Sequence, residues 1–154
     1  MYDDLLCRRI LLYASISGAI GIAMGAFGAH YLPVYLDHMA PRWDTDAQCM
    51  ARRMDQFDVG VRYHLVHSVA LLALASIERG SVASRRWTAR LFLLGIMLFS
   101  GSLYLLVLSN VTQLGAVTPI GGMAWIVGWL MLIWVTGGLR RRERRFAQIR
   151  GRQP

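Results

Sequence analysis

The sequence has no charged side chain between Leu91 and Leu139, and this absence excludes an ordinary soluble domain. A helix on the surface of a soluble core carries polar residues along one face. Residues 91–108, in contrast, are apolar on nearly every face over a length that can cross a bilayer. Because 55% of all residues are hydrophobic, the sequence predicts a protein embedded in a membrane.

The usual patterns of catalytic side chains are also missing. No Ser-His-Asp, Cys-His or glycine-rich phosphate-loop pattern is present, and no carboxylate lies within an apolar segment except near an end. The two cysteines, Cys7 and Cys49, fall on opposite sides of the membrane in the topology that the charges predict, so they cannot pair within one chain. They do not have metal-ligand spacing either. Catalysis and a metal centre are therefore poorly supported.

Lysine is absent, so all seventeen basic residues are arginine, and the formal net charge is +8. In a soluble chain such a charge would suggest a nucleic-acid partner. Here the arginines flank apolar segments, where they orient membrane spans, and we predict no binding to nucleic acid.

Four apolar segments lie between the clusters of charge, and each is long enough to be a membrane span. The predicted spans cover about residues 10–32, 59–77, 91–108 and 117–139. The predicted fold class is all-α: an integral membrane four-helix bundle that forms a single domain over residues 1–154, with a basic tail at 140–154. We interpret the first span as an uncleaved anchor, because its apolar run is too long for a signal peptide.

The arginines predict the orientation of these spans. Thirteen of the seventeen lie before the first span, between the second and third, or after the fourth. The other four, Arg42, Arg52, Arg53 and Arg62, lie in or near the first loop together with five aspartates. Since positive residues stay inside, we predict that the N- and C-termini are cytoplasmic and that the first loop faces outward.

The long first outer loop carries a helical pattern. Its apolar residues recur every three or four positions at Ala47, Met50, Met54, Phe57 and Val61, and Arg52, Arg53, Asp55 and Asp58 fill the other faces. The pattern predicts an interfacial amphipathic helix that lies in the headgroup plane and leads into the second span. Use of the methionines to bind a peptide is the alternative.

Small residues form three candidate packing faces. They are Ser17, Gly21, Gly25 and Ala29 on the first span, Ser100, Gly101 and Ser102 on the third, and Gly121 and Gly122 at the start of the fourth. Small side chains let helices approach closely in lipid, so each face fits either a neighbouring helix of the same chain or a helix of another protein. The sequence leaves both options open.

Histidines supply the candidate ligand site. His64 and His67 are three residues apart and occupy neighbouring positions on one helix face, while His30 and Tyr104 are expected near the same outer boundary. Two histidines are a weak metal signal, because protein zinc sites use three or four ligands. One interpretation is a structural hydrogen-bonding role without any cofactor. The other is a metal, proton or quinone site at these four residues.

Six residues at the inner boundary are predicted to anchor the protein among the lipid headgroups. They are Arg8, Arg9, Arg86, Trp87, Arg140 and Arg141. Tryptophan favours the interface between lipid and water, and arginine attracts the phosphates of anionic lipids there. Anionic lipids are accordingly an expected partner.

Four sequence blocks resemble those of a known family. They are Gly25-Ala-Phe-Gly-Ala-His30, Gly60-Val-Arg-Tyr63 with His67, Phe99-Ser-Gly-Ser-Leu-Tyr104, and Thr118-Pro-Ile-Gly-Gly122 with Gly128-Trp129. Together they resemble the DUF423 family of small inner-membrane proteins, the YgdD/YwdK type, which is related to transmembrane protein 256. The resemblance implies a multi-pass protein of a bacterial inner membrane and brings no established reaction. Two features depart from it: the outer loop is longer than is typical, and His64 stands where many members have glutamine.

The function we predict is that of a non-catalytic accessory subunit of a larger membrane complex, such as a respiratory or photosynthetic one. Four helices are not expected to bury a small-residue stripe, a Ser-Gly-Ser face and three tryptophans all at once. At least one face should therefore meet another subunit, a second copy of the chain or a specific lipid. The alternative is a small-ligand, metal or quinone-linked protein that uses His30, His64 and His67.

Overall fold

A computed structural model of the chain describes the backbone at residues 2–43, 46–77 and 81–150, and the side chains at 4–43, 46–77 and 81–135. Every regular element in these ranges is helical, which confirms the predicted all-α class. In chain order the elements are α1 (Tyr2–His30), α2 (Leu32–Trp43), α3 (Ala47–Ala75), α4 (Val82–Gly95), the π-helix η1 (Ile96–Ser100), α5 (Gly101–Ser109), the 3-10 helix η2 (Thr112–Ala116) and α6 (Thr118–Arg150).

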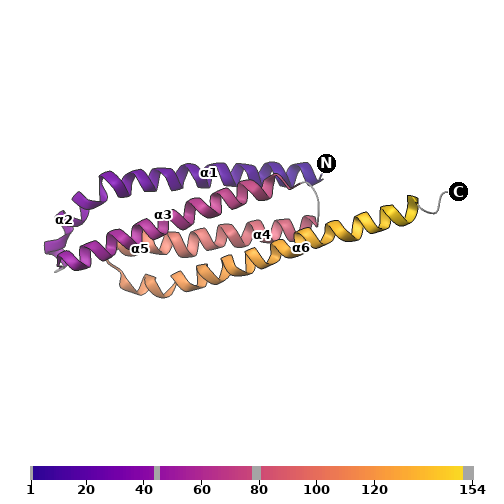
Figure 1. Cartoon of the computed structure of the whole chain (residues 1–154). Helices are drawn as coiled ribbons and strands as arrows, with labels where there is room; N and C mark the ends of the chain where they lie inside the picture. Colours follow the sequence, from indigo (N-terminus) through magenta and orange to yellow (C-terminus); the bar gives the residue numbers. More distant parts are fainter. Residues whose placement is uncertain (1, 44–45, 78–80, 151–154) are drawn as a thin grey trace.

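The long helices run side by side along one axis (Figure 1). The most extensive contacts join α1 to α3 and α4 to α6, and α5 also packs against α3. The elements α4, η1 and α5 follow one another without a break and form one rod. The start of α1, the end of α3 and the start of α4 lie at one end of the molecule, and α2 lies at the other (Figure 1).

Three stretches of helix are long and apolar enough to cross a membrane: Asp4–His30, Val82–Ser109 and Thr112–Val135. They overlap the first, third and fourth predicted spans. The second predicted span, 59–77, lies mostly in α3, which is not among these stretches in the described part of the chain. The physical reason is that α3 carries charged residues over its first half and polar residues on its buried face.

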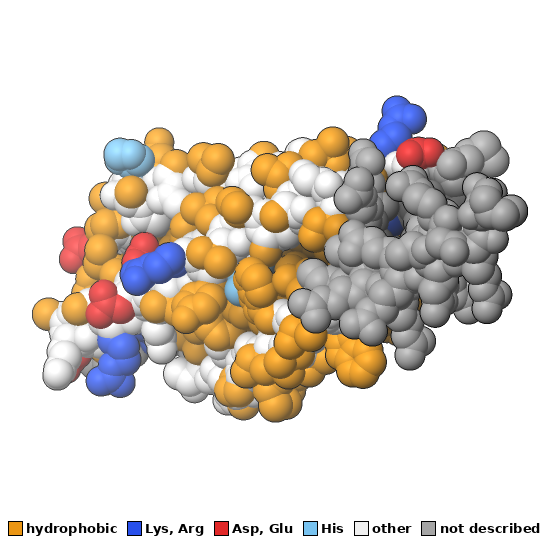
Figure 2. Space-filling view, turned by 45° about the vertical axis from the view of Figure 1, so that its right-hand side comes forward, with side chains coloured by type: hydrophobic (Ala, Val, Ile, Leu, Met, Phe, Trp, Pro, Cys, Tyr) orange, Lys and Arg blue, Asp and Glu red, His pale blue; other side chains and the backbone are white. Residues whose placement is uncertain are grey.

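Apolar side chains cover much of the outer surface. Figure 2 shows them over the middle of one face, with charged side chains toward its ends. On α1 the exposed apolar residues include Leu12, Ile16 and Ile22, and on α6 they include Ile126 and Ile133. Water does not favour such a band, whereas the hydrocarbon core of a bilayer does.

The predicted interfacial helix is not a separate element. Residues 47–61 form the first half of the continuous helix α3. The Asp46 carboxylate caps the start of α3 by accepting a hydrogen bond from the Cys49 N–H at 2.7 Å. Phe57 and Val61 are buried in the core, so this half of α3 packs against protein and does not lie flat on lipid.

The helix within the first loop is α2, which the sequence analysis does not predict. Pro33 lies in the first turn of α2, where its missing N–H costs nothing. Leu32 and Leu36 of α2 are fully buried against Phe57 of α3. Their burial holds α2 against the first half of α3.

The core consists of two apolar clusters that share α3. One contains Ile10, Ala14, Leu71, Leu74, Ala89, Phe92, Ile96 and Trp125. The other contains Leu32, Leu36, Phe57, Val61, Tyr104, Leu106 and Val107. The stretch of α3 between Val61 and Leu71 carries His64, His67 and Ser68, so polar groups occupy the middle of the core.

Candidate functional site

His64 is buried where α3 packs between α1 and α5. Its Nε2 atom lies 3.1 Å from Ser17 Oγ on α1, and its Nδ1 atom lies 3.3 Å from the Tyr104 hydroxyl on α5. Ser68, one turn further along α3, lies with its Oγ 2.7 Å from Ser17 Oγ and 2.9 Å from the His64 carbonyl oxygen. These four side chains form one buried cluster, which we call the His64 network.

The donors and acceptors of the His64 network can be assigned one after another. Ser68 donates its hydroxyl proton to the His64 carbonyl oxygen, so Ser68 Oγ accepts from the Ser17 hydroxyl. Ser17 Oγ in turn accepts from the His64 Nε2–H, and His64 Nδ1 pairs with the Tyr104 hydroxyl. Both ring nitrogens of His64 are therefore occupied within the chain.

His67 faces α4 and α6 instead. Its ring stacks on Trp125 with the centroids 3.8 Å apart and the planes 4° from parallel, and Phe92 meets it edge-on at 5.5 Å. Nδ1 donates to the Tyr63 carbonyl oxygen at 2.8 Å, and Nε2 accepts from the Trp129 Nε1–H at 3.2 Å. His67 is thus a neutral, fully bonded side chain within an aromatic cage.

The histidines do not come together in one cluster. His30 is exposed at the end of α1. With the rise of an ideal α-helix, it lies about 20 Å along the helix axis from Ser17. His64 and His67 point to different neighbouring helices. A group of three metal-ligating side chains does not occur among the described residues. The arrangement around His64 and His67 stabilises helix packing and leaves no ring nitrogen of either residue open to a ligand.

The small-residue face of α1 packs against α3 within the chain. Ser17 belongs to the His64 network, and a Cβ atom added to Gly21 would lie 2.7 Å from the side chain of Leu65. Gly25 faces α3 in the same way, whereas Ala29 is exposed.

The Ser-Gly-Ser face also has its contacts inside the chain. Ser100 is fully buried, and Ser102 Oγ donates to the Phe99 carbonyl oxygen at 2.9 Å. Ser102 Oγ also lies 2.8 Å from Thr118 Oγ1, at the start of α6. Gly101 between the two serines is half-buried.

Gly121 and Gly122 meet the same rod. A Cβ atom on Gly121 would lie 2.4 Å from the backbone nitrogen of Phe99, so only glycine allows this approach of α6. Gly122 lies beside the Phe99 ring, and Trp125 is buried. The small-residue faces are therefore largely covered within the chain, whereas the expectation that not all three tryptophans would be buried holds. Along the described part of α6 the exposed tryptophans are Trp129 and Trp134.

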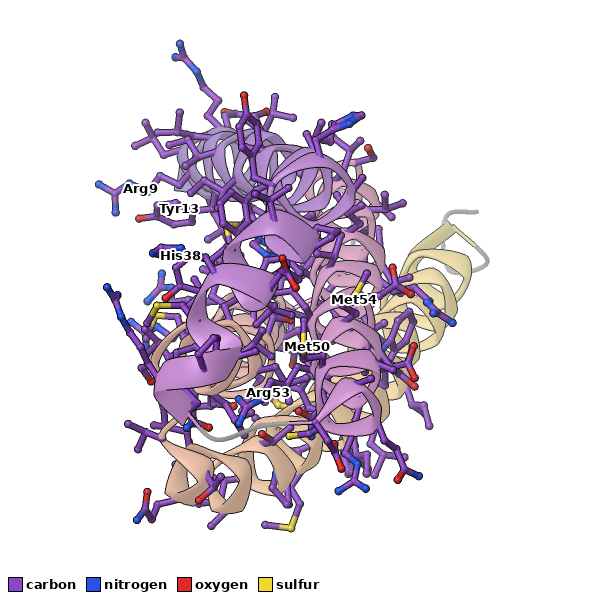
Figure 3. All side chains as sticks on the ribbon, turned by 90° about the vertical axis from the view of Figure 1, so that its left-hand side faces the viewer. Arg9, Tyr13, His38, Met50, Arg53 and Met54 are labelled. Carbon is purple, nitrogen blue, oxygen red and sulfur yellow. The ribbon has the colours of Figure 1, made fainter. Side chains whose placement is uncertain are left out.

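Two buried arginines are the residues that sequence reasoning misses. The sequence pattern assigns Arg53 to the wet face of an interfacial helix, but its side chain is 5% exposed and points inward between the helices (Figure 3). Its guanidinium donates to the Leu106 carbonyl oxygen at 3.4 Å and to the Asn110 side-chain oxygen, and lies 5.3 Å from the ring centre of Trp43. Arg53 thereby caps the C-terminal end of α5, where Asn110 takes the left-handed conformation with φ of 61°.

Arg85 has the corresponding position at the opposite end of the molecule. It is fully buried in α4, donates to the Ile77 carbonyl oxygen just beyond α3, and lies 3.3 Å from Cys7 Sγ of α1. The sequence predicts Arg85 as a boundary arginine like Arg86, because hydropathy does not distinguish a guanidinium in water from one that is bonded to a helix end.

The predicted lipid anchors with described side chains, Arg8, Arg9, Arg86 and Trp87, are exposed. Arg140 and Arg141 belong to α6, but their side chains lie outside the described residues. Contact with lipid headgroups stays a prediction for all of them.

Helices of this length and apolarity, with apolar side chains turned outward, define the chain as a membrane protein. Residues 24–122 match the family described as protein of unknown function DUF423. The chain belongs to this family, which confirms the resemblance carried by its sequence blocks.

The relatives span almost the same length as this chain. It is 33% identical to the UPF0382 inner membrane protein YgdD of Escherichia coli K12, over 89% of this chain and 94% of YgdD. It is 33% identical to the UPF0382 membrane protein YwdK of Bacillus subtilis, over 82% of this chain and 94% of YwdK. A UPF0382 membrane protein of Staphylococcus aureus is 34% identical over 84% of this chain and 95% of that relative. No solved structure matches the chain.

Proposed function

We propose that the chain crosses the membrane four times, with α3 as the additional crossing. The helices α1 and α4 begin at the same end of the molecule and run in the same direction (Figure 1). If both cross the membrane, the chain must return between them, and α3 is the segment that can make this return while packed along α1 and α5. Its buried polar side chains, including His64 and His67, face protein and not lipid, which removes the main cost of such a crossing.

The charges support a cytoplasmic location for both termini. The end of the molecule where α1 and α4 begin carries Arg8, Arg9, Arg86 and Arg90. At the other end, arginines of α2 and α3 are accompanied by aspartates. The positive-inside rule therefore favours the first end as cytoplasmic. A reporter fused to the C-terminus that works only in the cytoplasm is expected to be active. Activity of a reporter that works only outside would contradict this orientation.

Within the membrane, the protein acts as a non-catalytic accessory subunit in this proposal. The observation that carries it is that both buried histidines use both ring nitrogens in bonds within the chain. An imidazole that binds a ligand or transfers a proton needs one nitrogen within reach of its partner. His64 and His67 instead hold helices together, so the outer surface is where this protein would act.

One face of α6 fits a partner helix. Its exposed residues recur every three or four positions, at Met123, Ile126, Val127, Leu130, Ile133 and Trp134. Trp134 is 74% exposed, and large aromatic side chains are frequent anchors where proteins meet. A subunit of a larger membrane complex, or a second copy of this chain, would cover this face.

Two double variants test the accessory role. Leu130→Ala with Trp134→Ala removes apolar surface from the α6 face, and Leu12→Ala with Ile22→Ala removes exposed apolar surface from α1 as the matched control. Extraction in a gentle detergent is followed by native sizing and identification of co-migrating chains. We expect the wild type and the α1 variant to migrate as a complex and the α6 variant as a monomer. Stoichiometric foreign chains indicate an accessory subunit, this chain alone indicates self-association, and a monomeric wild type overturns both.

A small-molecule site beside His64 is the second candidate. A hollow of about 360 Å³ opens between α1 and the rod of α4, η1 and α5, and Ser17, His64 and Tyr104 form part of its wall. A metal or a quinone there would have to compete with the bonds of the His64 network. A stoichiometric metal or chromophore in the purified protein, lost in His64→Phe and kept in His30→Phe, would favour this function over the first.

A further inference from the structure

A groove runs between α1 and the rod formed by α4, η1 and α5. It has two parts, of about 510 and 360 Å³, which are neighbours because Tyr13 and Leu93 line both. The first part is also lined by Arg9 of α1 and by Arg86 and Arg90 of α4. We propose that this groove binds one anionic phospholipid, with its phosphate at the three arginines and an acyl chain along the apolar walls.

The three arginines supply the charge that a phosphate requires. All of them are exposed, and no ion pair joins them to a carboxylate within the part of the chain whose side chains are described. Arg86 and Arg90 are one helical turn apart, so their like charges repel each other until an anion binds nearby. Guanidinium groups bind phosphate by paired, charge-assisted hydrogen bonds, and such a contact would relieve the repulsion.

Tyr13 connects the charged part of the groove to the apolar part. It lies one turn from Arg9, and the two side chains point to the same side of α1 (Figure 3). Its hydroxyl is a hydrogen-bond donor at the depth where a phospholipid changes from phosphate to ester groups. Tyrosine side chains, apolar along the ring and polar at the tip, favour this level of a membrane.

Beyond the arginines the walls of the groove are mostly apolar, although Ser17, His64 and Tyr104 also line the inner part. The apolar residues include Leu5, Ile10 and Ala89 in the first part and Ile16, Ile20 and Met97 in the second. Between Arg9 and Met24, which lines the inner part, α1 rises about 22 Å, whereas one leaflet of the hydrocarbon core is roughly 15 Å thick. The groove is therefore long enough for an acyl chain.

The π-helix η1 borders the inner part of the groove. Ile96 and Met97 line it, and the Gly101 N–H bonds to the Ile96 carbonyl oxygen in the wider i→i+5 pattern. Single π-turns within α-helices are rare and occur frequently at functional sites. The position of η1 beside the groove is a second observation that fits a bound ligand.

The charged part of the groove lies at the end of the molecule where α1 begins. In the orientation proposed above this end is cytoplasmic, and the cytoplasmic leaflet presents anionic lipids. The lipid site does not depend on the accessory role, because it uses α1 and α4, whereas the partner face lies on α6.

Native mass spectrometry of the full chain in detergent tests the headgroup contact. The chain is titrated with phosphatidylglycerol and, separately, with phosphatidylcholine of the same acyl chains. We expect one bound phosphatidylglycerol at concentrations where phosphatidylcholine does not bind. Arg9→Gln and Arg86→Gln are each expected to lower the affinity about fivefold, the effect of one arginine near a lipid phosphate. Arg52→Gln is the matched control, since Arg52 of α3 is exposed, does not line the groove and is not one of the predicted lipid anchors, and it should change the affinity by less than about twofold.

Two further variants test the acyl chain. Leu93→Trp fills the junction of the two parts without a change in charge and should weaken binding of phosphatidylglycerol. Leu94→Trp changes the exposed neighbour, which does not line the groove, and should leave binding unchanged. Glycerol phosphate, which carries the charge without acyl chains, should not displace the lipid at equal concentration. Equal binding of phosphatidylcholine, an equal loss in Arg52→Gln, or displacement by glycerol phosphate would each overturn the proposal.

Discussion

Several buried side chains in this protein connect two helices, and His67 does so by two different means. Its ring stacks on Trp125 of α6, and its Nε2 atom accepts a hydrogen bond from Trp129 one turn further along. Hydrogen bonds between membrane helices contribute only about 0.6 to 2 kcal/mol each. The stacked ring and the apolar contacts of the cage must therefore supply much of the stability that His67 gives.

Substitution at His67 separates these two contributions. His67→Phe keeps a ring to stack on Trp125 but leaves the Trp129 N–H without its acceptor, and we expect a loss of about 1–2 kcal/mol in the free energy of unfolding. His67→Ala also empties the cage and should cost about 3–5 kcal/mol, as for other large-to-small changes in a core. Denaturant unfolding in detergent measures both values. His30→Phe on the exposed end of α1 is the control, and an unchanged His67→Ala would contradict the structural role.

Arg53 offers a second test at the scale of one residue. Arg53→Leu leaves the Leu106 carbonyl oxygen and the Asn110 side chain without their donor, so the protein should lose about 2 kcal/mol of stability. Arg52→Leu removes the same charge from the exposed neighbour and should have little effect. The same unfolding experiment compares the two variants. Equal losses of stability in the two variants would show that removal of a positive charge from α3 lowers stability and that loss of the cap on α5 does not.

Sequence patterns find the helices of this chain better than the partners of its polar residues. The spacing of His64 and His67 singles them out, but Ser17 and Trp129, to which they bond, lie in remote segments that meet only in the folded chain. Arg53 stands among charged residues and is therefore predicted to be exposed. The one local clue is Asn110, since asparagine after an apolar run favours the left-handed end of a helix.

At the scale of the helices, the contact between η1 and α6 depends on a glycine, because a larger residue at that position would not fit. The start of α6 lies so close to the end of η1 that the backbone of Phe99 occupies the space beside Gly121. The Thr-Pro-Ile-Gly-Gly block predicts both the start of α6 and a close approach there. It does not predict which helix approaches, because every small residue in an apolar segment gives the same pattern.

Two neighbouring glycines supply a matched pair of variants for this contact. In Gly121→Ala the new Cβ would meet backbone atoms of Leu98 and Phe99, so α6 must shift, and we expect a loss of about 1–3 kcal/mol or more. In Gly122→Ala the new Cβ makes ordinary contact with the Phe99 ring at 3.8 Å and should be tolerated. Thermal unfolding in detergent ranks the two variants. A Gly122→Ala variant as unstable as Gly121→Ala would show that the close approach to the Phe99 backbone does not set the effect, since alanine is otherwise the better helix former.

At the scale of the whole molecule, the course of the chain decides how many times it crosses the membrane. Three helical stretches are apolar enough to cross unaided. The helix α3 depends on its neighbours, because its polar face is satisfied only when α1 and α5 lie against it. Hydropathy in the sequence finds the apolar half of α3 as a span from 59, and the helical periodicity finds its polar beginning from Ala47. Neither signal shows that the two parts form one helix that packs inside the protein.

Thiol labelling tests whether α3 crosses. Cys49 lies near its start, and Ser76→Cys introduces a thiol just after its end. With Cys7→Ser, Cys49 is the one thiol left, and we expect a membrane-impermeant maleimide to label it in intact cells from which any outer barrier has been removed. With Cys7→Ser, Cys49→Ser and Ser76→Cys combined, labelling should require permeabilised membranes. Labelling of both positions from the same side would contradict the crossing.

The two buried arginines also restrict how α3 can pack against the rod of α4, η1 and α5. Arg53 belongs to α3 and holds the end of α5, whereas Arg85 belongs to α4 and holds the chain just beyond α3. If α3 slid by one turn, about 5.4 Å, along the rod of α4, η1 and α5, both guanidiniums would lose their carbonyl oxygens at once. The acceptor of Arg85 precedes it by 8 residues, whereas the acceptors of Arg53 follow it by 53 and 57 residues. During synthesis Arg85 can therefore be bonded as soon as α4 begins, whereas Arg53 at the start of α3 obtains its acceptors only after α5 has been made.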